Sequence, residues 1–220
     1  MKLEAVPNVR YSFTIQFIEA SVMFVRQASK IESMPSESVT EALRVEHRGL
    51  IVAAVMQCVA ALETEAFEIA NHGPGSYLGS EGCDVEAQKL LSPLAEFVDK
   101  QRTIDRFRII LQILRKEQID TSREPYQSTI LLVGLRNEIT HFKSLWGQQI
   151  TREKLSRGFS TLNHDPPPFI DEYSGYFPHK CLSADCGTWA VRTSVSFPDE
   201  IYRLLGVQSR FESVRDRITI

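Results

Sequence analysis

Three side chains that can act together on a phosphodiester lie within six positions of one another in the segment LRNEITHFKSLWG, residues 135–147. Arg136 provides a permanent positive charge, Asn137 a neutral amide, and His141 an imidazole that exchanges protons near neutral pH. Phosphodiester cleavage needs a cation to stabilise charge on the phosphoryl oxygens and a group that transfers protons. The segment is therefore a candidate site for cutting nucleic acid. The alternative is an ordinary solvent-exposed stripe that contains a histidine.

The motif is expected to lie on a helix. The apolar run STILLVGL precedes it, and Pro125 stands at a position suited to a first helical turn. These features predict a helix from about 125 to 146, with a break at the glycine that follows. Residues four apart lie on nearly the same face of a helix, so Asn137 and His141 are expected to project together. The long arginine side chain reaches the same region.

Other stretches carry apolar residues at spacings of three and four, which is the pattern of amphipathic helices. The predicted helices span about 10–31, 38–70, 93–116 and 184–206. Ser38-Val-Thr-Glu41 has the form of a capping box that opens the second of them, and Gly73 is expected to end it. Ser183 is the expected N-cap of the last helix, and Pro198 is expected to kink or interrupt it.

The segments between these helices are expected to be irregular. Residues 73–84 form a glycine-rich loop, and residues 158–180 form a long connection with HDPPPF at its centre. The aromatic residues of that connection either stack on bases or hold it against the bundle; they are Tyr173, Tyr176 and Phe177. No stretch has the alternation of a strand. The sequence predicts an all-α fold, an antiparallel bundle of four to six helices in one domain, with its core at about 38–206.

Composition limits the classes of function. The chain has 220 residues, 43% of them hydrophobic, and a formal net charge of −3. Proteins that coat nucleic acid non-specifically are strongly basic, so a role on RNA or DNA requires a local site. No apolar stretch approaches the roughly 20 residues of a membrane span, and the N-terminus lacks a secretory apolar region. We expect a soluble, cytoplasmic protein without membrane contact.

Charged residues are unevenly distributed. The candidate RNA-binding residues are the cations within and after the motif, namely Arg136, Lys143, Arg152, Lys154 and Arg157. Such a run can guide an RNA backbone towards His141, or it can be an ordinary solvated face. The acidic residues of the second helix are expected to form a solvated face that repels RNA; they are Glu41, Glu46, Glu63, Glu65 and Glu68.

The cysteines are expected to be reduced thiols, because disulfide-rich domains are shorter and richer in cysteine; they are Cys58, Cys83, Cys181 and Cys186. His179, Cys181 and Cys186 offer three metal ligands, but structural zinc sites space their cysteines more closely and add a second ligand pair. We therefore expect neither a metal nor another cofactor, and expect the cysteines to behave as small apolar residues. His47 and His72 are expected at the surface or at helix ends.

The motif Arg136-Asn137-Glu-Ile-Thr-His141 resembles the R-x4-6-H signature of HEPN domains, with a polar residue after the arginine. The context is also similar to that family. A long early helix rich in alanine and acids (AAVMQCVAALETEAFEIAN) precedes the motif, and a final helix follows an irregular connection. The resemblance covers about residues 38–206. It implies a bundle of four or five helices that usually dimerises, and often a metal-independent endoribonuclease of toxin–antitoxin, phage-defence or RNA-processing systems.

The resemblance also implies roles for the motif residues. Arg136 would contact the scissile phosphate, His141 would transfer a proton or orient the attacking 2′-hydroxyl, and Asn137 would hydrogen-bond within the site. The products would carry a 2′,3′-cyclic phosphate and a 5′-hydroxyl. Some toxin members carry a tyrosine two residues after the histidine, which a partner nucleotidyltransferase modifies; Lys143 occupies that position here. An antitoxin or nucleotidyltransferase remains a possible partner.

Two other functions stay open from the sequence: a non-catalytic helical module that binds nucleotide, RNA or a protein, and a structural dimerisation bundle. Arg136 and His141 are five residues apart, so their directions on an ideal helix differ by about 140°. One helix presents such a pair awkwardly to a single phosphate. We therefore expect a homodimer in which the two motifs face each other, with Phe142 and Trp146 as the apolar patch.

Overall fold

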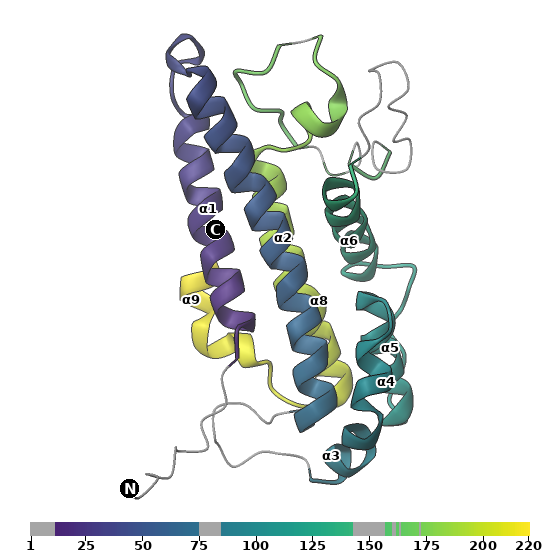
Figure 1. Cartoon of the computed structure of the whole chain (residues 1–220). Helices are drawn as coiled ribbons and strands as arrows, with labels where there is room; N and C mark the ends of the chain where they lie inside the picture. Colours follow the sequence, from purple (N-terminus) through teal and green to yellow (C-terminus); the bar gives the residue numbers. More distant parts are fainter. Residues whose placement is uncertain (1–11, 75–84, 143–156, 160–161, 163, 172) are drawn as a thin grey trace, which may run out of the picture.

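The structure is a computed structural model, which describes residues 12–74, 85–142, 157–159, 162, 164–171 and 173–220. These residues are largely helical and contain no strand, so the predicted all-α bundle is confirmed (Figure 1). The elements in chain order are α1 (Thr14–Glu32), η1 (Ser36–Ser38), α2 (Glu41–His72), α3 (Val85–Leu91), η3 (Ser92–Leu94), α4 (Ala95–Asp99), α5 (Thr103–Ile113), α6 (Tyr126–Thr140), η5 (Tyr176–Lys180), α8 (Ala184–Leu205), η6 (Arg210–Val214) and α9 (Arg215–Ile218).

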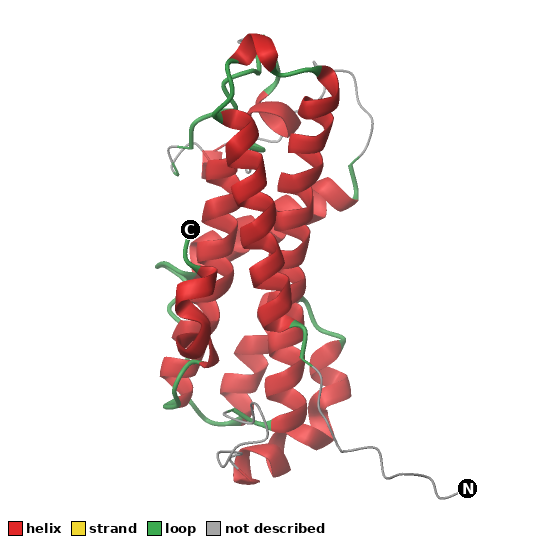
Figure 2. Ribbon diagram, turned by 90° about the vertical axis from the view of Figure 1, so that its left-hand side faces the viewer, coloured by secondary structure: helices red, strands yellow, loops and turns green. Residues whose placement is uncertain are grey.

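The three longest helices, α1, α2 and α8, pack against one another (Figure 1), and Figure 2 shows that the long helices run along the length of the molecule. α1 runs antiparallel to α2, and its last residue, Glu32, contacts His47 near the start of α2. α8 runs parallel to α2, because Gly187 lies beside Ile51 while Tyr202 bonds to a glutamate further along α2. The long connection before α8 carries the chain back to the end where α2 starts, which permits this direction.

The crossing of these helices requires a small residue at position 187. A Cβ atom added to Gly187 would lie 2.6 Å from a methyl carbon of Val25 and 3.2 Å from one of Ile51. Glycine therefore lets the backbone of α8 approach α1 and α2 closely. The main hydrophobic core extends from this crossing to the inner faces of α5 and α6; fully buried members include Ile18, Leu62, Phe107, Leu132 and Phe197.

The ends of α2 and α8 follow local signals in the sequence. The hydroxyl of Ser183 accepts a hydrogen bond from the backbone N–H of Cys186 (3.3 Å), which confirms the predicted N-cap. Gly206 at the end of α8 is left-handed with φ +78°, and Gly73 at the end of α2 also has a positive φ of +74°. Both predicted helix ends are confirmed.

One other prediction about these helices is wrong, and a second is wrong in part. The N-cap of α2 is Thr40, which accepts from the N–H of Leu43 (3.3 Å), whereas Ser38 donates to the carbonyl of Pro35 within the η1 turn. α8 continues through Pro198 to its end without interruption. The interruption predicted at Pro198 is therefore wrong, while a kink there stays a prediction. Proline removes one backbone donor, but its neighbour Phe197 is fully buried, and packing on this side holds the helix together.

The predicted third helix, about 93–116, is divided in two. α4 ends at Asp99 and α5 begins at Thr103, because Arg102 adopts an extended backbone with ψ 148°. The break shifts the buried face: Phe97 is 54% exposed, while its neighbour Val98 is fully buried. A short helix, α3, precedes this region and was not predicted.

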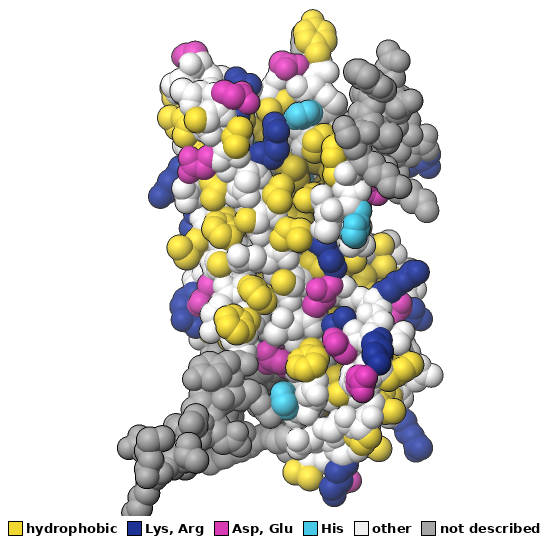
Figure 3. All heavy atoms as spheres, viewed as in Figure 1, with side chains coloured by type: hydrophobic (Ala, Val, Ile, Leu, Met, Phe, Trp, Pro, Cys, Tyr) yellow, Lys and Arg dark blue, Asp and Glu magenta, His cyan; other side chains and the backbone are white. Residues whose placement is uncertain are grey.

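α2 is more apolar than the sequence analysis expected. It is the one helix of the described residues that is long and apolar enough, by length and composition, to cross a membrane. The statement that no stretch approaches a membrane span is therefore wrong for α2. Half of its most apolar window is buried inside the bundle, and a buried core helix can pass the same test of length and composition. Figure 3 shows hydrophobic side chains exposed along the face formed by α1 and α2.

Two acids of α2 are buried in an ionic cluster rather than solvated. Glu65 is fully buried and Glu68 is 5% exposed, and both accept hydrogen bonds from Arg210 (2.8 and 3.1 Å). The hydroxyl of Tyr202 donates to Glu65, and burial raises the pKa of this carboxyl group. The predicted solvated acidic face is wrong for these two residues. Through Arg210, the cluster ties the C-terminal segment to α2.

His47 is also buried, which contradicts the expected surface position. Its Nε2 atom lies 2.8 Å from a carboxylate oxygen of Glu32. The same oxygen accepts from the backbone N–H of Ala184 in the first turn of α8 (2.8 Å), and the ring packs edge-on against Phe169. Glu32 thus joins α1, α2 and the positive end of α8, where a carboxylate is favourable.

Candidate functional site

The motif helix is shorter than predicted. α6 ends at Thr140, and His141 is its C-cap residue with φ −109° and ψ 29°. The backbone N–H of His141 donates to the carbonyl of Asn137 (2.9 Å), so these two residues remain one turn apart. Both side chains are exposed. The histidine therefore stands at the rim of the bundle and not within the helix.

α6 joins the bundle at both of its ends. Near its start, the indole N–H of Trp189 donates to the hydroxyl of Ser128 (3.3 Å), which links α6 to α8. Near its end, the hydroxyl of Thr140 donates to the carbonyl of Arg136 (2.8 Å) and lies 3.5 Å from the sulfur of Met56 in α2. The motif is thus held against the middle of α2.

Arg136 is fixed by an ion pair that the sequence did not indicate. Its Nη2 atom lies 2.5 Å from a carboxylate oxygen of Glu63 in α2, and Thr103 of α5 donates to the same oxygen (2.8 Å). The arginine side chain is 21% exposed and the glutamate side chain 34%. The ion pair fixes the guanidinium between three helices. Sequence analysis missed Glu63 and Thr103 because acids and threonines on helices carry no local signal of such a contact.

The ion pair leaves part of the guanidinium available. A guanidinium has five N–H donors in a planar fork, and Glu63 engages one of its terminal nitrogens. The Nε atom of Arg136 is buried and has no hydrogen-bond partner among the described residues. Unsatisfied buried donors are rare and require an explanation, of which a ligand is one. Glu63 also offsets the positive charge, so the site attracts an anion less strongly than a free arginine would.

The candidate RNA-binding residues are only partly described. Lys143, Arg152 and Lys154 lie outside the described residues, as does Trp146. Arg157 is described and exposed. The basic run after the motif therefore stays a prediction.

A groove among the described residues lies elsewhere. It has a volume of about 720 Å³, and its lining includes Ser128 at the start of α6 and Trp189 on α8. Its lining does not include Arg136 or His141. Arg203 in its wall is paired with Glu200 (2.7 Å). The motif residues and this groove therefore lie at different places on the molecule. We assign the candidate site to the motif, because its side chains can act on a phosphodiester.

The described cysteines behave as core residues. Cys58, Cys181 and Cys186 are free and buried, and the described residues contain no group of three or more His, Cys, Asp or Glu placed to hold a metal ion. Burial raises the pKa of the Cys58 thiol to about 11 and that of Cys181 to about 12. Cys83 lies outside the described residues.

These thiols are expected to resist alkylation in the folded protein. The thiolate is the reactive form, and a thiol with a pKa near 11 is only ~0.1% ionised at pH 8. Iodoacetamide at pH 8, followed by peptide mass spectrometry, should leave Cys58, Cys181 and Cys186 unmodified, while all three react once guanidinium unfolds the chain. Rapid labelling of Cys181 in the native protein would contradict its burial.

Comparisons with known proteins return no match: no protein-family model, no curated protein and no solved structure is similar to this chain.

Proposed function

We propose that the protein is a metal-independent endoribonuclease of the HEPN type, acting on RNA in the cytoplasm. The observation that best supports this function is the arrangement at the end of α6. The guanidinium of Arg136 is fixed by Glu63 and partly exposed, and the exposed imidazole of His141 follows five residues later. These groups supply the two requirements of phosphodiester cleavage, a positioned cation and a proton-transfer group.

In this mechanism the nucleophile belongs to the RNA. His141 takes the proton of the 2′-hydroxyl as its oxygen attacks the adjacent phosphorus, and Arg136 stabilises the charge that develops on the phosphoryl oxygens. The bond from phosphorus to the 5′-oxygen breaks, and the leaving oxygen takes up a proton. Asn137 hydrogen-bonds to the reacting groups. Holding the arginine through Glu63 reduces the reorganisation needed when the charge develops.

The purified protein is expected to cut single-stranded RNA in the presence of EDTA, because every group in this mechanism belongs to the chain or the RNA. Single-stranded DNA of the same sequence should stay intact, since it lacks the 2′-hydroxyl. Gel electrophoresis of labelled oligonucleotides measures both. Cleavage of DNA, or cleavage that EDTA abolishes, would contradict the proposal.

A binding module without catalysis is the second candidate. The Glu63 carboxylate, 2.5 Å from Arg136, favours it because the ion pair weakens the attraction for phosphate. In this case RNA or nucleotide would bind without being cut. Binding measured by fluorescence anisotropy, together with intact RNA after long incubation, would favour this candidate over the ribonuclease.

We also propose a homodimer in which the two motifs face each other. Ile130 and Phe142, in and just after α6, are 46% and 43% exposed and offer an apolar surface to a second copy. A two-fold interface uses one such patch twice, and it would place His141 of each copy near Arg136 of the other.

Light scattering at micromolar concentration is expected to give about twice the chain mass of 25.0 kDa. Ile130→Asp should lower both the dimer fraction and the rate of RNA cleavage, because a charge in an apolar interface must be desolvated. Met23→Asp, a change at a residue that is 67% exposed on α1, is the matched control. A monomer that cleaves RNA at full rate would contradict the shared site.

A further inference from the structure

A second pair of an arginine and a histidine lies close to the motif in space. Arg48 of α2 and His179 of η5 are 131 positions apart in the sequence, and the Nη2 atom of Arg48 lies 3.3 Å from Nδ1 of His179. Both side chains are partly exposed. In Figure 1, η5 is drawn in green above α6. Figure 3 shows basic and histidine side chains exposed together on this face of the molecule.

The geometry of this pair fixes its hydrogen-bonding character. A guanidinium only donates, so Nδ1 of His179 is the acceptor, and a neutral ring then carries its proton on Nε2. Burial, followed by the charge of Arg48, lowers the pKa of His179 and keeps the ring neutral at pH 7. The groups of this pair that remain to donate are the other N–H groups of Arg48 and the N–H of His179. These N–H groups can donate hydrogen bonds to the oxygen atoms of an anion such as phosphate.

The surrounding charges leave this character intact. Among the described residues, Arg48 forms no ion pair with a carboxylate. Asp171 is the acid that raises the pKa of His179, against the larger lowering effects, and it accepts hydrogen bonds from the hydroxyl of Ser174 (3.1 Å) and the N–H of Tyr173 (2.9 Å). The carboxylate of Asp171 is occupied by Ser174 and Tyr173. An arginine and an imidazole side by side are groups that commonly bind phosphate.

The pair is connected to the motif through an aromatic contact. The ring of Phe142, the residue after His141, lies 5.9 Å from the ring of Phe177, centre to centre. Phe177 is buried and precedes His179 by two residues in η5. The contact holds η5 beside the end of α6, so the two arginine–histidine pairs belong to one surface of the molecule.

We propose that Arg48 and His179 bind a backbone phosphate of single-stranded RNA a few nucleotides away from the one that is cut. The inference rests on the proposed ribonuclease function and extends it, because it gives the site a second contact with the same strand. A contact to a flanking phosphate fixes the register of the strand and carries no sequence information. It adds to affinity in a salt-dependent manner.

The test measures binding separately from cleavage. The probe is a fluorescent, fully 2′-O-methylated RNA of about ten nucleotides, which lacks the attacking hydroxyl and stays intact. Its affinity for the full chain is measured by anisotropy across a range of salt concentrations. Arg48→Ala is expected to weaken binding about tenfold, since it removes a charge-assisted hydrogen bond, and to lower the salt slope by about 0.7. His179→Ala should also weaken binding.

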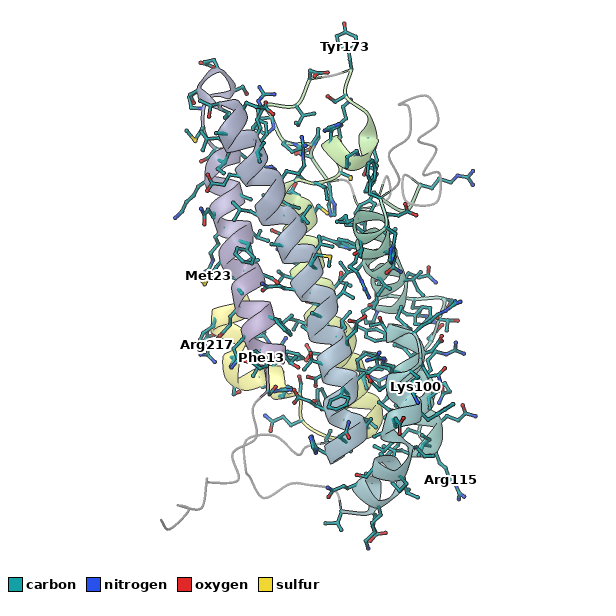
Figure 4. All side chains as sticks on the ribbon, in the orientation of Figure 1. Phe13, Met23, Lys100, Arg115, Tyr173 and Arg217 are labelled. Atoms are coloured by element: carbon teal, nitrogen blue, oxygen red, sulfur yellow. The ribbon has the colours of Figure 1, made fainter. Side chains whose placement is uncertain are left out.

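Arg115→Ala is the matched control, because it removes an exposed cation at the opposite end of the molecule from η5 (Figure 4). Its affinity and salt slope should equal those of the wild type. Arg48→Gln, which keeps the first three side-chain carbons and a polar end, replaces Arg48→Ala if the latter melts early. If the wild type cuts RNA and both Arg48 variants bind the probe as tightly as the wild type, this inference is wrong while the proposed ribonuclease function stands. If the wild type neither binds nor cuts RNA, the proposed function fails with it.

Discussion

Replacing His141 with alanine is expected to lower the rate of RNA cleavage by about 10²–10⁴-fold, the usual contribution of a positioned proton-transfer group. Arg136→Ala is expected to lower it by about 10²–10³-fold, since it removes the cation that stabilises the developing charge. Rates are compared with saturating single-stranded RNA in EDTA. The melting temperature of His141→Ala should match that of the wild type, because the histidine side chain is exposed beyond the end of α6.

The control is His72→Ala, which removes a histidine from the far end of α2 and should leave cleavage unchanged. Arg136→Ala also leaves Glu63 without its ion pair, so its melting temperature is measured as well. A partly exposed pair of this kind contributes about 1 kcal/mol or less. If both variants of the motif cleave at the rate of the wild type, the motif is not the site. If both unfold at much lower temperature, the two residues are structural.

The second large effect concerns the buried ionic cluster. Arg210→Met is expected to destabilise the protein by about 3–5 kcal/mol, because Glu65 and Glu68 then lose their shared cation in the interior. For a chain of this size the melting temperature should fall by roughly 6–20 °C. Differential scanning calorimetry measures the change. Lys100→Met is the control, since its ion pair with Glu96 is on the surface and its loss should cost little.

The same variant has a predicted dependence on pH. Burial raises the pKa of Glu65 in the folded state above its value in the unfolded chain. The charge of Arg210 lowers this pKa, so the pKa of Glu65 rises further when Arg210 is removed. The folded variant then binds more protons than the unfolded variant. The free energy of unfolding of Arg210→Met should therefore increase as the pH falls from 7 towards 5. Adding Glu65→Gln to this variant should restore part of the lost stability at pH 7. Equal destabilisation at both pH values would contradict this account.

The parts of the fold that were predictable are those fixed by local chemistry. α8 starts after a serine that caps it and ends at a left-handed glycine, and both signals are visible in the sequence. α6 ends at Thr140, where the sequence has neither glycine nor proline. Its buried residues, Thr129, Leu132 and Leu135, stop one turn earlier, and packing rather than a local signal ends the helix.

The partners of the charged residues were not predictable, since they come from distant positions. Glu63 and Arg136 are 73 positions apart, and Glu65 and Arg210 are 145 apart. Each glutamate lies on a long helix where a solvated position is the ordinary expectation. The motif identified the residues able to do chemistry, while the fold determined that its arginine is held by an acid.

The end groups of the RNA fragments test the central claim most directly. The account assigns the attack to the 2′-hydroxyl of the RNA, with His141 taking its proton and Arg136 at the phosphate. Mass spectrometry of fragments cut by the wild-type protein in EDTA should find a 2′,3′-cyclic phosphate on one side of each cut and a 5′-hydroxyl on the other. Fragments with a 5′-phosphate and a 3′-hydroxyl would mean that water attacks instead, and would contradict the mechanism.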